Sequence, residues 1–81
     1  MSFFTMEEIF LERKSVKSSK VKSIGYDEDT CILEVEFNNS SIYHYHGVPL
    51  KLYNRLMNDS SKGRFMKNKI RYKYKNSCIK K

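Results

Sequence analysis

The segment 31–37 constrains the fold most, because from Leu33 onward apolar and acidic side chains alternate one by one. Such alternation is typical of a β-strand that buries one face and exposes the other. It predicts that the carboxylates lie in solvent and that Cys31 is a small core residue. The apolar set is Cys31, Leu33, Val35 and Phe37, and the acidic set is Glu34 and Glu36.

Two further strands are predicted beside this one. Residues 21–26 form the first, in which Gly25 is a candidate bulge, and residues 42–46 form the third. The turn signals Asp27-Glu28-Asp29 and Asn38-Asn39-Ser40 separate the three strands. Strands joined by short loops predict an antiparallel three-stranded meander. In the third strand the tyrosines share one face, and the outward face carries Ile42, His44 and His46.

Helices follow the sheet. Pro49 suits the first turn of a helix, and apolar residues four apart at Val48, Leu52 and Leu56 predict a helix over about 49–58. A second short helix is predicted over about 61–70, with extended chain beyond it. The fold class is therefore α+β, with the first helix packed on the sheet.

The two ends of the chain are expected to lie outside the domain. Residues 1–14 are an N-terminal extension with a candidate short helix at about 6–13, since Thr5 and Glu8 fit a capping box. Residues 15–75 form the domain, and 76–81 are expected to be a frayed basic tail.

Charge is uneven along the 81 residues. Residues 51–81 carry eleven Lys or Arg against Asp59 alone, whereas residues 1–50 are net acidic. This asymmetry points to a polyanionic partner, although a solvated Lys-rich surface would look the same. No apolar run approaches the roughly 20 residues of a membrane span. Since no signal peptide is recognisable either, we expect a cytoplasmic protein.

The sequence offers no catalytic constellation. Its three glycines are scattered, which excludes a Gly-rich phosphate loop. His44 and His46 could begin a zinc site, but a structural site normally needs four ligands, so we predict no metal and no cofactor. Cys31 and Cys78 are not expected to form a disulfide. The protein is therefore not expected to be an enzyme.

An ordered set of residues spans about 16–75 and consists of Ser18-Ser19, Val21, Ile24-Gly25-Tyr26-Asp27, Leu33, Val35, Phe37, Tyr43-His44-Tyr45, Val48-Pro49, Tyr53, Leu56, Ser61-Lys62-Gly63, Phe65, Ile70-Arg71 and Tyr74. This set resembles the KTSC domain, which occurs at the C-terminus of some lysyl-tRNA synthetases and as a stand-alone bacterial or phage protein. The resemblance implies a small domain, and its synthetase context suggests RNA binding. Asp59 and Lys67 depart from the family pattern.

Two groups of residues are candidates for binding. Cations of the last third would contact phosphates, with Ser61 capping the second helix, and Arg71 could instead pair with Glu34 or Glu36. Tyr43, Tyr45 and His44 are candidates for base stacking, but packing of the tyrosines under the first helix is favoured. The phosphate-binding set is Ser61, Lys62, Arg64, Lys67, Lys69, Arg71 and Lys73.

The leading functional hypothesis is a non-catalytic module for RNA or another polyanion. Two alternatives stay open. One is a protein-interaction module, phage-encoded or not, for an acidic surface, and the other is a small homo-oligomer that holds a nucleotide.

Overall fold

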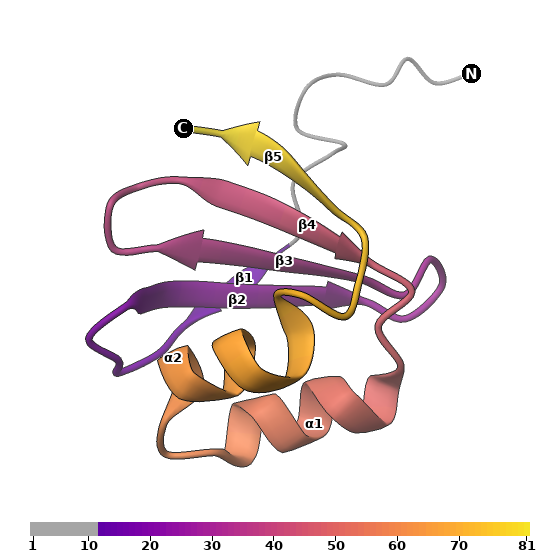
Figure 1. Ribbon diagram of the computed structural model, residues 1–81, viewed down its shortest axis with the longest axis horizontal. Coiled ribbons are helices and arrows are strands. Elements are labelled where there is room, and N and C mark those ends of the chain that lie inside the picture. Colours follow the sequence, from indigo (N-terminus) through magenta and orange to yellow (C-terminus); the bar gives the residue numbers. More distant parts are fainter. Residues whose placement is uncertain (1–11) are drawn as a thin grey trace.

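A computed structural model describes residues 12–81 as a five-stranded antiparallel sheet with helices against one face (Figure 1). The α+β class is confirmed, but the predicted three-stranded sheet is too small. The strands are β1 (Arg13–Ser15), β2 (Val21–Asp27), β3 (Ile32–Phe37), β4 (Ile42–His46) and β5 (Asn76–Lys80). The helices are α1 (Leu50–Asn58), α2 (Lys62–Phe65) and a π-helical continuation, η2 (Met66–Ile70). Within these residues no helix is long and apolar enough to cross a bilayer.

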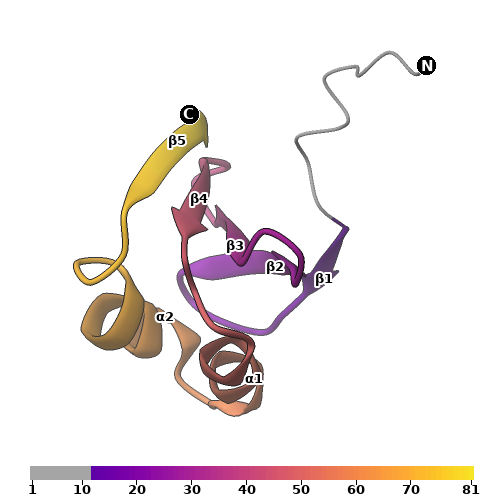
Figure 2. The same ribbon diagram turned by 90° about the vertical axis from the view of Figure 1, so that its right-hand side faces the viewer.

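The strands lie in the order β1-β2-β3-β4-β5, so each pairs with its neighbours in sequence. Val35 of β3 pairs with Ile24 on one side and Tyr43 on the other. Since partners across a ladder share a face, these side chains all point toward the helices, which lie on that face (Figure 2). The two outer strands are the ones that the sequence did not predict.

The core lies between this face and the helices. Leu33, Val35, Leu56 and Phe65 are buried as their spacing predicts, whereas Phe37 and Leu52 are only partly buried at its rim. The apolar members of the core cluster are Val21, Ile24, Leu33, Val35, Tyr45, Val48, Leu56, Phe65, Met66 and Ile70.

The C-terminal segment is the largest correction to the fold. Residues predicted to be a frayed tail form β5, which pairs with β4 and places Cys78 opposite Tyr43. The chain reverses first, because the backbone N–H groups of Lys73 and Tyr74 both donate to the carbonyl of Ile70. The predicted extended chain directly after Ile70 is therefore a turn.

Cys31 does not belong to the strand. Its φ of 59° places it in the left-handed region at the end of the β2–β3 turn, and its side chain is only partly buried. Asp27 organises this turn, since its carboxylate accepts hydrogen bonds from the N–H of Asp29 and the hydroxyl of Thr30. The prediction that Cys31 is a core residue is wrong, because the strand begins only at Ile32.

Both helices are confirmed within a residue or two. Pro49 occupies the N-cap of α1, and Leu56 is fully buried on the face that its spacing predicts. The second helix runs continuously through α2 and η2, but its last turn is π-helical. There the N–H of Arg71 donates to the carbonyl of Met66, five residues back.

Strand β1 lies against Gly25 of β2. A Cβ atom at Gly25 would stand 2.6 Å from the carbonyl oxygen of Glu12, so glycine permits this close approach. The register irregularity of β2 falls between Val21 and Ser23, not at Gly25. The predicted helix at 6–13 lies almost entirely outside the described residues, and its last residue, Arg13, begins β1.

Candidate functional site

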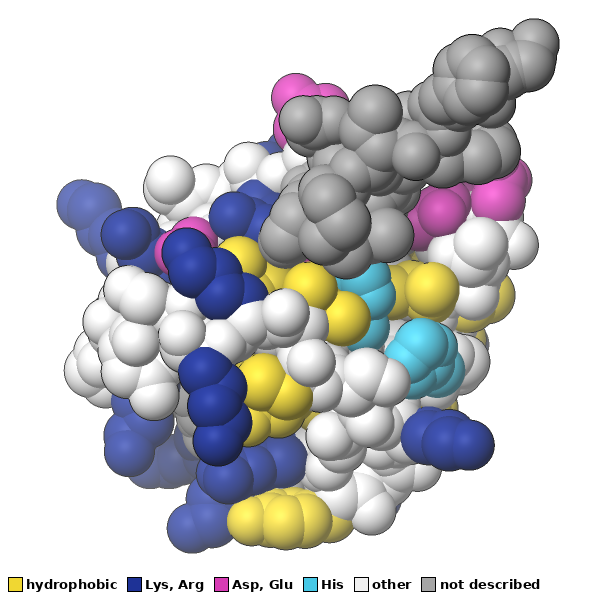
Figure 3. Space-filling view, turned by 90° about the horizontal axis from the view of Figure 1, so that it is seen from above, with side chains coloured by type: hydrophobic (Ala, Val, Ile, Leu, Met, Phe, Trp, Pro, Cys, Tyr) yellow, Lys and Arg dark blue, Asp and Glu magenta, His cyan; other side chains and the backbone are white. Residues whose placement is uncertain are grey.

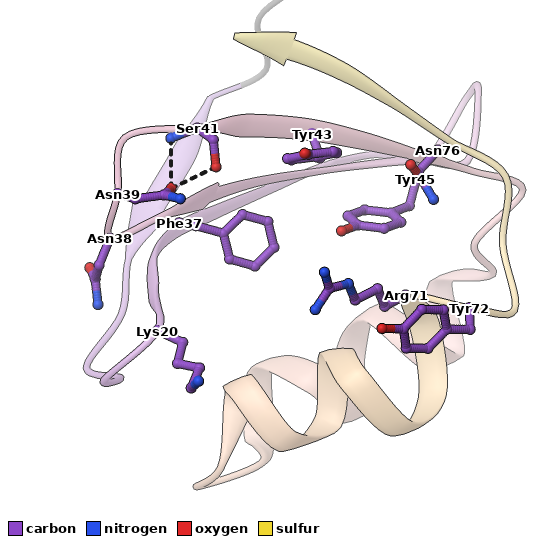
Figure 4. A pocket seen from close by; sticks show the side chains of 10 residues that line it. All are labelled: Lys20, Phe37, Asn38, Asn39, Ser41, Tyr43, Tyr45, Arg71, Tyr72 and Asn76. Atoms are coloured by element: carbon purple, nitrogen blue, oxygen red, sulfur yellow. Dashed lines mark hydrogen bonds between the residues drawn. The ribbon is translucent and has the colours of Figure 1, made fainter. Parts of the chain in front are cut away.

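A groove runs between the second helix and the helix-facing side of the sheet. It consists of two adjoining cavities of about 580 Å³ and 810 Å³, which share Lys20, Phe37, Arg71 and Tyr72. Figure 4 shows the smaller cavity, into which the Arg71 side chain extends beneath Tyr45. We refer to the two cavities together as the groove.

The groove is basic throughout. No Asp or Glu is among the described residues that line it, and none of its cations forms an ion pair with a carboxylate within residues 12–81. Viewed from above the sheet, most Lys and Arg side chains gather to the left and below, away from most acidic ones (Figure 3). The lining cations are Lys20, Lys62, Arg64, Lys67 and Arg71.

Lys20 reaches the groove from the β1–β2 loop. Its backbone N–H lies 3.2 Å from the Ser18 hydroxyl, and its carbonyl accepts a hydrogen bond from Asn38. A Cβ at Gly63 would lie 3.3 Å from the Cβ of Lys20, so the missing side chain lets the lysine stem pass close to α2. Two loops and one glycine thus place this cation opposite those of the second helix.

Arg71 enters the groove at the end of the π-helical turn. Burial raises the pKa of Tyr45 to about 12, while the nearby Arg71 guanidinium acts in the opposite direction. The Tyr45 hydroxyl therefore remains protonated at neutral pH and offers the Arg71 guanidinium no negative partner.

The aromatic residues of the groove differ in exposure. Tyr45 is only 2% exposed, and Tyr43 lies between Phe37 and Tyr45, with ring centroids 5.8 Å and 6.3 Å away. Tyr45 therefore belongs to the core and Tyr43 is partly buried against it, as the packing interpretation predicts, but they border Arg71 and Tyr72 in this cavity rather than the predicted first helix. Tyr72, in contrast, is 75% exposed.

The structure brings together most of the residues that the sequence singled out. Lys69 and Lys73 are exposed but do not line the groove. Ser61 is the N-cap of α2, yet its side chain makes no capping hydrogen bond, and its N–H donates instead to the Asp59 carboxylate. The predicted residues that do line the groove are Ser61, Lys62, Arg64, Lys67, Arg71, Tyr43 and Tyr45.

Sequence reasoning missed Lys20 and Tyr72. Lys20 lies far from the basic third of the chain, and only the packing of Gly63 against it brings the two regions together. A sequence pattern could have identified Tyr72, since aromatic and basic residues alternate over 71–75. The sequence predicts extended chain after Ile70, whereas residues 71–73 form a turn that exposes the ring.

The opposite face of the sheet corrects three predictions. Glu34 is fully buried rather than solvent-exposed, because it forms an ion pair with Arg13 and lies 2.7 Å from Nε2 of His44. His44 is also buried, so it is excluded from base stacking in the groove. Arg71 does not pair with Glu34 or Glu36, since both carboxylates point away from the groove.

Hydrogen bonds and ion pairs join the side chains of this polar cluster, which are Arg13, Ser23, Glu34, Glu36 and His44. Arg13 donates from Nε to the Ser23 hydroxyl at 2.9 Å, and that hydroxyl donates to Glu36 at 2.9 Å. The cluster therefore fastens β1 to β2 and β3. His44 and His46 have ring centroids 6.4 Å apart, but in the part of the chain that the structure describes no three potential ligands gather as a metal site would require.

Comparison with known proteins agrees with this architecture. The model of the KTSC domain matches residues 17–74. The crystal structure of a KTSC domain protein from Yersinia pestis superposes with a TM-score of 0.83 at 38% identity, covering 86% of this chain and 99% of that one.

Relatives include single-domain and much longer proteins. An uncharacterised protein of Stutzerimonas stutzeri is 39% identical over 54 residues, which are 67% of this chain and 76% of that protein. A lysine–tRNA ligase of Trichormus variabilis is 36% identical over 59 residues, but these are 73% of this chain and only 10% of the ligase. On the match over 17–74 and the shared fold, the chain belongs to the KTSC domain family.

Proposed function

We propose that this protein is a non-catalytic module that binds RNA through phosphate contacts in the groove. One observation carries the proposal: five cations line a continuous groove that has no acidic residue among its described lining. Cations without carboxylate partners create a positive potential that attracts a polyanion. The low-dielectric walls of a groove strengthen that potential.

The spacing of the cations along the groove favours a polymer over a small anion. Lys20 comes from the loop before β2, Arg64 and Lys67 come from the second helix, and Arg71 comes from its end. A chain of phosphates can contact all of these together. Such contacts position a nucleic acid and carry little sequence information.

The test is a pair of charge variants with the same change in net charge. Arg64→Gln with Lys67→Gln removes two cations from the groove, whereas Lys69→Gln with Lys73→Gln removes two exposed cations that do not line it. Fluorescence anisotropy with a labelled single-stranded RNA would be measured at several salt concentrations. Thermal unfolding should be nearly unchanged in both variants, because exposed charges contribute little to stability.

We expect the groove variant to lose affinity for unrelated RNA sequences about equally. Its plot of log affinity against log salt should flatten by roughly 1.4, since each phosphate contact on a single strand contributes about 0.7 to the slope. The control variant should change the slope much less. Equal losses in both variants would show that overall charge, not the groove, holds the RNA. No binding by the unmodified protein at low salt would refute the proposal.

A further inference from the structure

The most exposed aromatic ring of the described chain lies in the groove. Tyr72 is 75% exposed, whereas the other aromatic residues of the groove, Phe37, Tyr43 and Tyr45, are buried or partly buried. Tyr72 adds little to the core, so stability does not explain a large apolar ring at this position. It lines both cavities, at the point where they join.

The neighbour of this ring is Arg71. The guanidinium carbon of Arg71 lies 5.4 Å from the centroid of the Tyr72 ring, within the range of a cation–π interaction. Figure 4 shows the two side chains next to each other at the helix end of the cavity. The contact limits the freedom of the ring before any ligand arrives.

The residues that the sequence offered as candidates for stacking are less suitable. Tyr45 is almost fully buried, and the ring of Tyr43 is occupied by contacts with Phe37 and Tyr45. His44 lies on the other face of the sheet, bonded to Glu34. A base that enters the groove would therefore meet Tyr72 first.

We propose that Tyr72, backed by Arg71, stacks on an unpaired base of a single-stranded RNA. This inference rests on the proposed function. The phosphates beside that base would lie against Lys20, Arg64 and Lys67, which line the cavity that Tyr72 closes. A duplex keeps its bases stacked on one another and offers no free base face to the tyrosine, so the groove should prefer a single strand.

The experiment uses the full chain with Tyr72→Ala, Tyr72→Phe and Tyr72→Trp. Because the native sequence has no tryptophan, Tyr72→Trp creates a single fluorescent reporter at the stacking position. Ligands are single-stranded RNA, single-stranded DNA, duplex RNA and inorganic polyphosphate. Polyphosphate provides the charge without bases.

We expect Tyr72→Ala to weaken binding of single-stranded RNA by about fivefold to more than a hundredfold, the range for loss of one stacked base. Binding of polyphosphate should change less than twofold, and Tyr72→Phe should bind the RNA nearly as tightly as the native chain. The tryptophan of Tyr72→Trp should be quenched by the single strand and not by polyphosphate. If single-stranded RNA and single-stranded DNA bind equally, the groove contacts the bases and phosphates but does not distinguish the sugar.

Three results would overturn the inference: unchanged RNA affinity in Tyr72→Ala, equal losses for RNA and polyphosphate, or duplex binding as tight as single-strand binding. If polyphosphate still binds the groove in those cases, the phosphate contacts of the proposed function stand without the stacking. Absence of binding to every ligand would refute both.

Discussion

Replacing Arg13 by methionine tests the buried polar cluster most directly. The change keeps the apolar stem of the side chain but removes the guanidinium that pairs with Glu34, whose side chain is completely buried. Removal of one partner from a buried ion pair typically costs about 3–5 kcal/mol, because the other charge remains without solvent.

The expected cost here lies at the lower end of that range. Arg13 is 22% exposed, and Glu34 keeps His44 as a partner at 2.7 Å. We therefore expect Arg13→Met to lose roughly 3 kcal/mol of unfolding free energy. For a domain of this size, each kcal/mol shifts the midpoint of thermal unfolding by about 4–8 °C, so the midpoint should fall by more than 10 °C.

The assay is urea unfolding followed by circular dichroism, for the native chain, Arg13→Met, Glu34→Gln and the double variant. Neutralising Glu34 removes the charge that Arg13→Met leaves buried, so the double variant should lose less than the two single losses combined. Lys14→Met is the matched control, since it removes an exposed cation from the next position of β1. Strictly additive losses, or a loss in Arg13→Met no larger than in Lys14→Met, would refute the role of the pair.

Two further predictions concern stability. Unfolded tyrosine ionises near pH 10, whereas burial raises the pKa of Tyr45 to about 12, so the native state should lose roughly 2 kcal/mol between pH 10 and 12. In urea unfolding across that pH range, Tyr45→Phe should reduce this loss of stability. Part of the loss should remain, because burial also raises the pKa of Tyr26 to about 12. An unchanged pH dependence in Tyr45→Phe would contradict the assignment of the loss to Tyr45. Gly25→Ala would force a methyl group to within 2.6 Å of the Glu12 carbonyl oxygen and should cost about 1–3 kcal/mol in the same assay, whereas an unchanged midpoint would show that β1 does not approach Gly25 so closely.

Much of the fold followed from local patterns. The alternation of β3 identified Leu33 and Val35 correctly, and the spacing of Val48 and Leu56 identified α1. The same alternation misplaced Glu34, because a period of two shows which residues share a face but not what covers that face. Arg13 contributes to that cover through its ion pair with Glu34, and its approach depends on the register of β1.

The site could be predicted only in part for a similar reason. Arg64, Lys67 and Arg71 stood out because they are close together in sequence. Lys20 joins them only through its packing beside Gly63, and Tyr72 is exposed only because a turn replaces the expected extended chain. Both depend on tertiary contacts, and the stretch that forms β5 has no strong strand pattern of its own.

The strand order has a consequence for the folding of the domain during its synthesis on the ribosome. Each strand pairs with a sequence neighbour, so the hairpins β2–β3 and β3–β4 can form as soon as they emerge. β5 begins only at Asn76, well after β4 ends at His46, which means a delay of a few seconds at roughly 5–20 residues per second. Until then β4 is an open sheet edge that other chains can pair with. Once β5 pairs, β4 becomes an inner strand and the edge moves to β5, which carries the exposed Lys80 and is a poorer template for pairing with other chains.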